Sequence, residues 1–165
     1  MTRHYETSDA VFSHLDAIVP TLPAMLQSQY VGFAAVSAVT VYELAIKDVF
    51  VNFSQKKHKT FGHFVAEHFR RINGRIGLND LRTIHIVRFG RKYLERFDFL
   101  LEMEEKKVLL TDRKSIKSSY GNLIEWRNSF AHEGQPPRNA TYDEVAKSYE
   151  MGKKVINCLA NAMVR

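Results

Sequence analysis

Residues 24–53, AMLQSQYVGFAAVSAVTVYELAIKDVFVNF, form the longest uninterrupted helical pattern in the chain. At a rise of ~1.5 Å per residue, a helix of this length extends over about 45 Å. Apolar side chains recur along it in alternating steps of four and three residues, which places them on one stripe. The stripe contains Ala35, Val39, Tyr42, Ile46, Val49 and Phe53, and it is widened by Phe33, Val36, Val41 and Leu44. We therefore expect this helix to be central and buried.

Helix signals also occur on both sides of this segment. On the N-terminal side, Ser8 is a suitable cap for a short helix that ends at Val19, before Pro20. On the C-terminal side, Thr60 and Asn79 are suitable caps for a third and a fourth helix. These signals predict a series of helices packed around the long one.

The C-terminal part of the chain continues the helical pattern. Residues 93–110 favour either one helix or two short ones. Ser115 can cap a helix that reaches about Ala131, and Thr141-x-x-Glu144 is a capping box that begins the last helix. Along one side of this last helix lie Val145, Tyr149, Ile156, Leu159 and Met163.

Length and composition define the fold class. The 165 residues suffice for one domain, and the low counts of Gly (8) and Pro (4) favour long helices over many short strands. We predict a single all-α domain over residues 1–165, a bundle of five or more helices around the long second helix. Within it, residues 1–19 are the segment that we expect to be an N-terminal appendage helix.

The charge balance is basic, with 24 Lys and Arg against 18 Asp and Glu, a net charge of +6. Eleven basic and three acidic residues lie between Lys56 and Arg96, so much of the excess is local. A polyanionic partner is one explanation, because Lys and Arg neutralise phosphates in nucleic-acid complexes. Greater solubility alone is the other, and the composition does not separate the two.

Several features of the sequence indicate the cellular compartment of the protein. Cys158 is the lone cysteine, so no intrachain disulfide can form, and its presence without a metal-type Cys/His spacing favours a reducing interior. The first sixteen residues are too polar for a signal segment, and the apolar-rich residues 31–46 are too short to span a bilayer. We therefore expect a soluble cytoplasmic protein with no membrane contact.

The stretch LIEWRNSFAHEG, residues 123–134, carries the candidate chemistry. Arg127 falls on the apolar stripe of its helix, where a guanidinium is costly unless it meets a carboxylate, a phosphate or a partner chain. Asn128 and His132 are four residues apart and share a face, whereas Arg127 and His132 are separated by about 140° around the helix. Arg127 and His132 of one chain are therefore not expected to form a direct pair.

The pattern Arg127-Asn128-x-x-x-His132, followed by Gly-x-Pro-Pro and a capped last helix, resembles the motif of the HEPN family (higher eukaryotes and prokaryotes nucleotide-binding). Among its subgroups, the chain is most similar to the RiboL-PSP type. The resemblance implies metal-independent cleavage of RNA in a toxin or antiviral-defence setting, without a cofactor or a metal site. It also implies a homodimer whose two motifs face each other, with Arg127, His132 and Asn128 as the site residues.

These residue types suit that reaction. Histidine exchanges protons near neutral pH, and arginine stabilises charge that develops on a phosphate. The product would be a 2′,3′-cyclic phosphate or its hydrolysed form.

The alternative to an active nuclease is a catalytically silent HEPN module that binds nucleotide, RNA or a protein partner. Gly134 stands where some HEPN toxins have a tyrosine that a partner enzyme modifies, so this regulation is not expected here, although another kind of antitoxin or regulatory protein remains open.

Three further residues have two interpretations each. Glu43 is the one formal charge between residues 31 and 46, and it either holds Arg127 in place or pairs with Lys47 on an exposed side. Trp126 is expected in the core or at a dimer interface rather than as a platform for stacking bases. His85 lies among apolar residues, which favours a core histidine with satisfied hydrogen bonds over a ligand.

Overall fold

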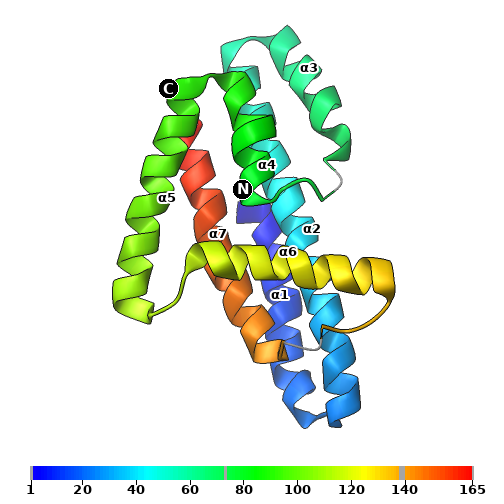
Figure 1. Ribbon diagram of the computed structural model, residues 1–165. Helices are drawn as coiled ribbons and strands as arrows, with labels where there is room; N and C mark the ends of the chain where they lie inside the picture. Colours follow the sequence, from blue (N-terminus) through cyan, green and yellow to red (C-terminus); the bar gives the residue numbers. More distant parts are fainter. Residues whose placement is uncertain (1, 73, 138–139, 165) are drawn as a thin grey trace.

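A computed structural model describes residues 2–72, 74–137 and 140–164 of the chain (Figure 1). Within these ranges the protein is helical and contains no strand, which confirms the all-α prediction. The main helices are α1 (Thr2–Ile18), α2 (Ala24–Lys57), α3 (Lys59–His68), α4 (Leu78–Asp80), α5 (Arg91–Asp112), α6 (Ile116–Glu133) and α7 (Tyr142–Ala162). Short helical turns at Val19–Thr21, Phe69–Arg71, Leu81–His85 and Ile86–Phe89 complete the set.

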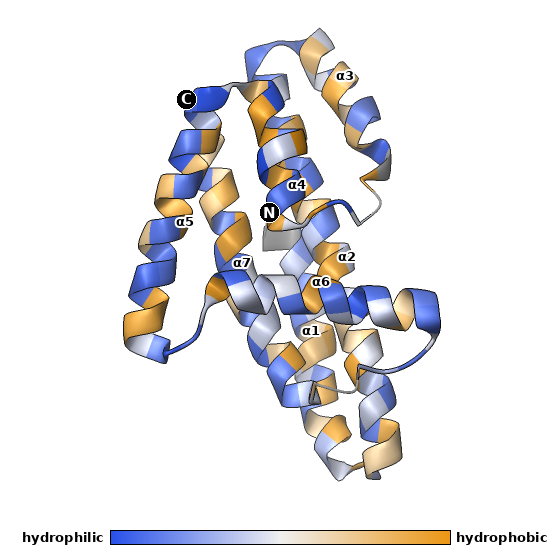
Figure 2. Cartoon of the chain, in the orientation of Figure 1, coloured by the Kyte–Doolittle hydropathy of each residue, from blue (hydrophilic) through white to orange (hydrophobic). Residues whose placement is uncertain are grey.

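The long helix α2 is the centre of the bundle, as predicted. It contacts α1, α3, α6 and α7, and all six residues of its apolar stripe are buried. In Figure 1, α6 crosses α2 and α7, while α5 lies on the outer side of α7. Hydrophobic and hydrophilic residues alternate along α5, α6 and α7 (Figure 2), as expected for helices with one face on a core.

One expectation about α2 is wrong. Phe33 and Leu44 were expected to help bury its middle all round, but they are 59% and 42% exposed. The reason is that the neighbouring helices of this chain leave one face of α2 uncovered. This exposed apolar face is adjacent to the candidate site described below.

The first and third helices start at residues other than those predicted. The first helix begins at Thr2, and Ser8 is a buried residue within it rather than its cap, because Tyr5 and Phe12 pack into the core on the same helix. The third helix begins at Lys59 with His58 as its cap, since Nδ1 of His58 accepts a hydrogen bond of 3.2 Å from the backbone N–H of Thr60. The start of α1 therefore depends on packing against the core, whereas the start of α3 depends on a local side-chain contact of His58 that was not predicted.

Other boundaries agree with the sequence or refine it. Residues 91–112 form one continuous helix, α5. The fourth helical segment starts at Leu78 rather than after Asn79, with Gly77 as its cap residue. Ser115 caps α6, and the predicted capping box at the start of α7 is present.

Helix α1 is joined to α7 as well as to α2. The hydroxyl of Tyr149 donates to Asp9 over 2.8 Å, and the hydroxyl of Tyr142 donates to Asp16 over 2.7 Å. The rings of Phe12 and Tyr149 stack with their centroids 4.4 Å apart. Aromatic rings that also carry satisfied hydroxyl groups therefore fix the N-terminal helix against the last one.

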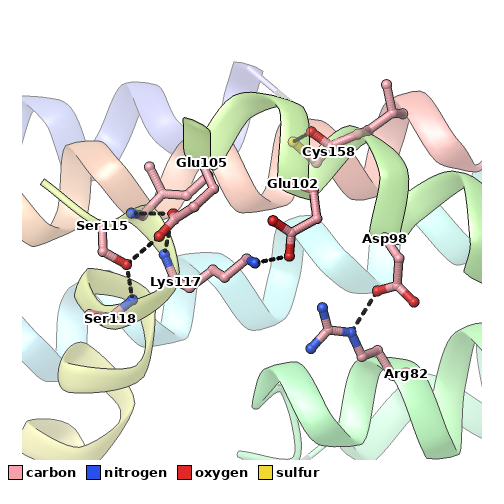
Figure 3. A network of polar contacts seen from close by, with 10 residues as sticks. Arg82, Asp98, Glu102, Glu105, Ser115, Lys117, Ser118 and Cys158 are labelled. Carbon is pink, nitrogen blue, oxygen red and sulfur yellow. Dashed lines mark hydrogen bonds and ion pairs between the residues drawn. The ribbon is translucent and has the colours of Figure 1, made fainter. Parts of the chain in front are cut away.

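A buried carboxylate fixes the start of α6 (Figure 3). Glu105 of α5 is only 8% exposed, and it accepts hydrogen bonds from the hydroxyl of Ser115 and from the backbone N–H groups of Ile116 and Lys117. The first N–H groups of a helix have no partner within it, and they favour a negative charge. Glu105 therefore determines where α6 begins and how it lies across the bundle.

Candidate active site

The guanidinium of Arg127 lies between α6 and α2. One Nη2 hydrogen bond joins it to Oε1 of Glu43, and the two side chains are 18% and 19% exposed. Its Nη1 donates to Oδ1 of Asn128 over 2.9 Å. The cost of placing a charge on the apolar stripe is thus offset by a partly buried carboxylate. Of the two interpretations of Glu43, the structure selects the contact with Arg127, and no ion pair joins Glu43 to Lys47 within the described residues.

A glycine closes the other side of this guanidinium. Gly74 lies in the connector that joins the α3 region to α4, which we define as residues 74–77, and its φ is +77°. A Cβ atom at Gly74 would lie 2.8 Å from Nη1 of Arg127. The connector is itself anchored, because the Tyr120 hydroxyl donates to the carbonyl of Ile76 over 2.6 Å. This contact between connector and motif was not predicted from the sequence, because nothing in the local pattern around Gly74 refers to Arg127.

Asn128 and His132 line a shallow, open hollow on the surface of α6. Gly77 of the connector borders the same hollow, together with Gly121, Ile124, Glu125, Ser129 and Glu133. His132 is exposed, whereas Arg127 is not among the lining residues. The structure therefore brings Asn128 and His132 together, as their spacing predicts, and it keeps Arg127 on another face. Asn128 connects the hollow with Arg127, because it lines the hollow and its amide oxygen accepts a hydrogen bond from the guanidinium.

The aromatic residues beside the motif have different environments. Trp126 is buried, at 6% exposure, so it packs within the chain and is not available to a partner. Phe130 packs against Gly32 of α2 so closely that a Cβ atom there would collide with its ring. Its ring also meets the exposed Phe33 edge-on, with centroids 5.2 Å apart. The exposed apolar face of α2 thus continues onto α6.

The end of α6 extends beyond its neighbours. Ala131, His132 and Glu133 are all exposed. The helix ends at Gly134, which has a φ of +65° and donates its N–H to the carbonyl of Phe130 over 3.1 Å. Glycine adopts this left-handed conformation without the strain that a side chain causes. The last turn is therefore well defined in position and open to solvent.

Comparison with protein-family models assigns the chain to a family. The family model for RiboL-PSP-HEPN matches residues 4–165, and this range includes every helix that contributes to the site. The chain belongs to the RiboL-PSP-HEPN family. No curated protein and no solved structure matches the chain. Membership identifies a HEPN module related to nucleotides or RNA, and HEPN domains commonly bind RNA or dimerise.

Two other titratable groups of this HEPN domain are buried in the core, His85 and Cys158. His85 is 6% exposed, and its Nε2 lies 2.7 Å from the carbonyl oxygen of Arg75, while Nδ1 has no hydrogen-bond partner in the described structure. Burial lowers the pKa of His85, which favours the neutral ring with its proton on Nε2. It is a core histidine, as expected, but only half satisfied. Burial also raises the pKa of the Cys158 thiol to about 11, which makes it a poor nucleophile.

Within residues 2–72, 74–137 and 140–164, no group of three or more His, Cys, Asp or Glu side chains is arranged to hold a metal ion. No helix in the same ranges is both long enough and apolar enough to cross a bilayer.

Proposed function

We propose that this RiboL-PSP-HEPN domain is a metal-independent endoribonuclease of the toxin or antiviral-defence type, active in the cytoplasm as a homodimer. The observation that carries the proposal is the arrangement at the end of α6. There, Glu43 and Asn128 hold the guanidinium of Arg127, while His132 is exposed beside the same asparagine. A fixed positive charge near a free imidazole is suited to phosphodiester cleavage.

The chemistry follows from the two side chains. His132 of one chain removes the proton from a ribose 2′-OH, and the resulting oxygen attacks the adjacent phosphorus. The bond to the 5′-oxygen breaks, and that oxygen takes a proton from a second imidazole. Arg127 stabilises the negative charge that develops on the phosphate oxygens. The products are a 2′,3′-cyclic phosphate, which water can hydrolyse, and a free 5′-hydroxyl.

A dimer would provide catalytic groups that a single chain does not bring together in one site. Arg127 and His132 of one chain lie on different faces of α6, and each chain has one motif histidine for two proton transfers. A two-fold axis beside the motif would place a second Arg127 and a second His132 in the same cleft.

The exposed face of α2 supports a dimer in this place. Leu26, Phe33 and Leu44 are 47%, 59% and 42% exposed, and their spacing of seven and eleven residues places them on one side of the helix. Exposed apolar side chains that gather on one side of a helix are typical of an interface. Phe130 extends the face to the motif, so an interface here would bring the two motifs together. Of the two expectations for Trp126, the structure shows the core, so Phe33 and not Trp126 is the aromatic residue that we propose for the interface.

A catalytically silent module that binds nucleotide, RNA or a protein partner is the second candidate. It is favoured by the pairing of Arg127 with Glu43, which already neutralises the guanidinium in the absence of any phosphate. In this case an antitoxin or regulatory protein is as suitable a partner as RNA.

Cleavage of a structured RNA in EDTA separates the two candidates. We expect the wild-type protein to cut and His132→Ala to be inactive, with His14→Ala, an exposed histidine on α1, as the matched control. The silent module is the better description if the wild type does not cut at high enzyme concentration, or if His132→Ala cuts as well as the control. Light scattering of the wild type tests the dimer, and a monomer at micromolar concentration contradicts the shared cleft.

A further inference from the structure

A second hollow lies away from the motif, where α3 meets the turn at Ile86–Phe89. Its floor is rigid, because Phe69 and Phe89 stack on Phe50 of α2 with centroid distances of 4.7 and 5.0 Å. Its rim is exposed, since Phe64 is 69% exposed and Phe61 is 38% exposed. An aromatic ring as exposed as Phe64 contributes little to the core, and its position beside an aromatic hollow makes it available to a flat ligand.

The rim also has a positive charge. Nη1 of Arg88 lies 2.7 Å from Nε2 of His68. A guanidinium can only donate, so the imidazole accepts this hydrogen bond and is neutral in this contact. None of the ion pairs in the described part of the chain includes Arg88, and its side chain is exposed. The charge of Arg88 is therefore available to an anion beside the aromatic hollow.

These features together suit one kind of ligand. Exposed aromatic rings stack on unpaired nucleobases, and arginine binds phosphate with charge-assisted hydrogen bonds. Exposed Lys56, Lys57 and Lys59 lie at or before the start of α3, and exposed Arg70 follows its end, where it pairs with Glu67. A flat ring linked to a phosphate is the chemistry of a nucleotide, either free or within an RNA strand.

The hollow is close enough to the motif for one RNA strand to reach both. His68 and Gly74 are six residues apart, and a chain extends at most about 3.6 Å per residue, which limits their separation to roughly 22 Å. Gly74 in turn contacts Arg127. In Figure 1, α3 and the C-terminal end of α6 lie on the same side of the view, opposite α5. The strand is therefore a better candidate for the ligand than a free nucleotide.

We propose that this hollow binds an unpaired base of the RNA substrate. Phe64 and His68 stack on the base, and Arg88 contacts the adjacent phosphate. The inference rests on the proposed function in taking RNA as the ligand, but it concerns binding and not cleavage. It assigns an RNA-binding role to α3, outside the family motif.

The test measures the affinity of a labelled single-stranded RNA by fluorescence anisotropy, in the His132→Ala background so that the RNA stays intact. We expect Phe64→Ala to weaken binding about five- to tenfold and Phe64→Trp to retain it, because stacking on an aromatic ring is lost only in the first. The matched control is Phe99→Ala on α5, which is 63% exposed and should leave the affinity unchanged. Arg88→Gln should weaken binding and reduce the salt dependence by about one phosphate contact.

A cleavage assay of otherwise wild-type protein, run in parallel, separates the two proposals. If RNA is cut but Phe64→Ala binds RNA as tightly as Phe99→Ala, the base-binding hollow is wrong and the nuclease stands. If RNA is not cut but its binding depends on Phe64, the nuclease is wrong and the hollow stands. Adenosine monophosphate provides the third arm. Binding of this nucleotide that depends on Phe64, without any effect on RNA affinity, would identify a free-nucleotide site and overturn the inference.

Discussion

The two ends of α6 are each held by a carboxylate from another helix, but the two carboxylates have different partners. At the N-terminal end, Glu105 is 8% exposed and accepts three hydrogen bonds from a hydroxyl and two backbone N–H groups (Figure 3). At the C-terminal end, Glu43 is 19% exposed and holds the guanidinium of Arg127. Glu105 satisfies groups that the helix itself leaves unpaired, whereas Glu43 positions a side chain that the fold alone does not need.

This difference separates stability from function along one helix. Loss of Glu105 leaves buried N–H groups without partners, which affects the folded state. Loss of Glu43 leaves a guanidinium that can still reach solvent or a phosphate, which affects geometry more than folding. We therefore expect substitutions at the first end to change the free energy of unfolding and those at the second to change cleavage.

The largest effect is expected for Arg127→Ala. It removes the group that stabilises the developing phosphate charge, so cleavage should fall about 10²–10³-fold. The proposed dimer should persist, because Glu43 already neutralises Arg127 within each chain. Cleavage rates and light scattering on the same preparation check this. Arg127→Lys is the control for charge alone, and full activity in it would contradict the positioning of a guanidinium by Glu43 and Asn128.

The second effect is at the opposite end of α6. Glu105→Ala should lower the free energy of unfolding by about 2–4 kcal/mol, because a hydroxyl and two backbone N–H groups lose a charged acceptor. Urea denaturation measures the change. The matched control is Glu102→Ala on the same helix, where the carboxylate is exposed and pairs with Lys117. An equal loss in both variants would show that Glu105 acts as an ordinary surface charge.

The two ends of α6 also differ in how readily the sequence predicts their carboxylate contacts. Arg127 draws attention because a charge interrupts an apolar stripe, and Glu43 does so because it is an isolated charge in an apolar segment. Each is a charged residue in an otherwise apolar segment, and such a residue in one helix suggests an oppositely charged partner in another. Glu105 lies within the charged run Glu102–Lys107, where nothing distinguishes the buried carboxylate from its exposed neighbours. Its role depends on how α5 and α6 meet, which no local pattern contains.

The same reasoning explains the rest of the fold. The central helix and the capping box at Thr141 are periodic or local features, and the structure confirms them. The start of α1 was wrong because burial of Tyr5 and Phe12 extends the helix past Ser8. The contact of Gly74 with Arg127 joins residues 53 positions apart, so it depends on tertiary packing alone.

The third effect concerns Glu43 itself. Glu43→Gln preserves the size of the side chain but removes the charge that holds the guanidinium. Cleavage should fall about 10- to 100-fold, which is less than for Arg127→Ala because the arginine is still present. The free energy of unfolding should fall by only about 1–2 kcal/mol, since the pair is partly buried but a glutamine can still accept a hydrogen bond from the guanidinium.

A double variant determines whether Glu43 acts through Arg127. If the two residues work as a unit, adding Glu43→Gln to Arg127→Ala should cause no further loss of cleavage. Multiplication of the two losses would instead mean that Glu43 contributes independently of the arginine. Lys47→Gln, four residues along the same helix, is the control for a general change of charge on α2.

The smallest effect uses two glycines that share a backbone conformation. Gly74 and Gly134 both have positive φ, so an alanine at either position should cost about 1 kcal/mol of stability. Only at Gly74 would the added Cβ meet the motif, 2.8 Å from Nη1 of Arg127, whereas at Gly134 it meets nothing within 4 Å. Gly74→Ala should therefore also reduce cleavage several-fold, and Gly134→Ala should not, when rates are compared at equal fractions of folded protein. The two substitutions impose the same kind of backbone strain, so the loss of cleavage caused by strain should be equal in both variants. Any further loss in Gly74→Ala is then due to the contact with Arg127. Equal rates in the two variants would mean that the connector only covers the guanidinium and does not help to position it.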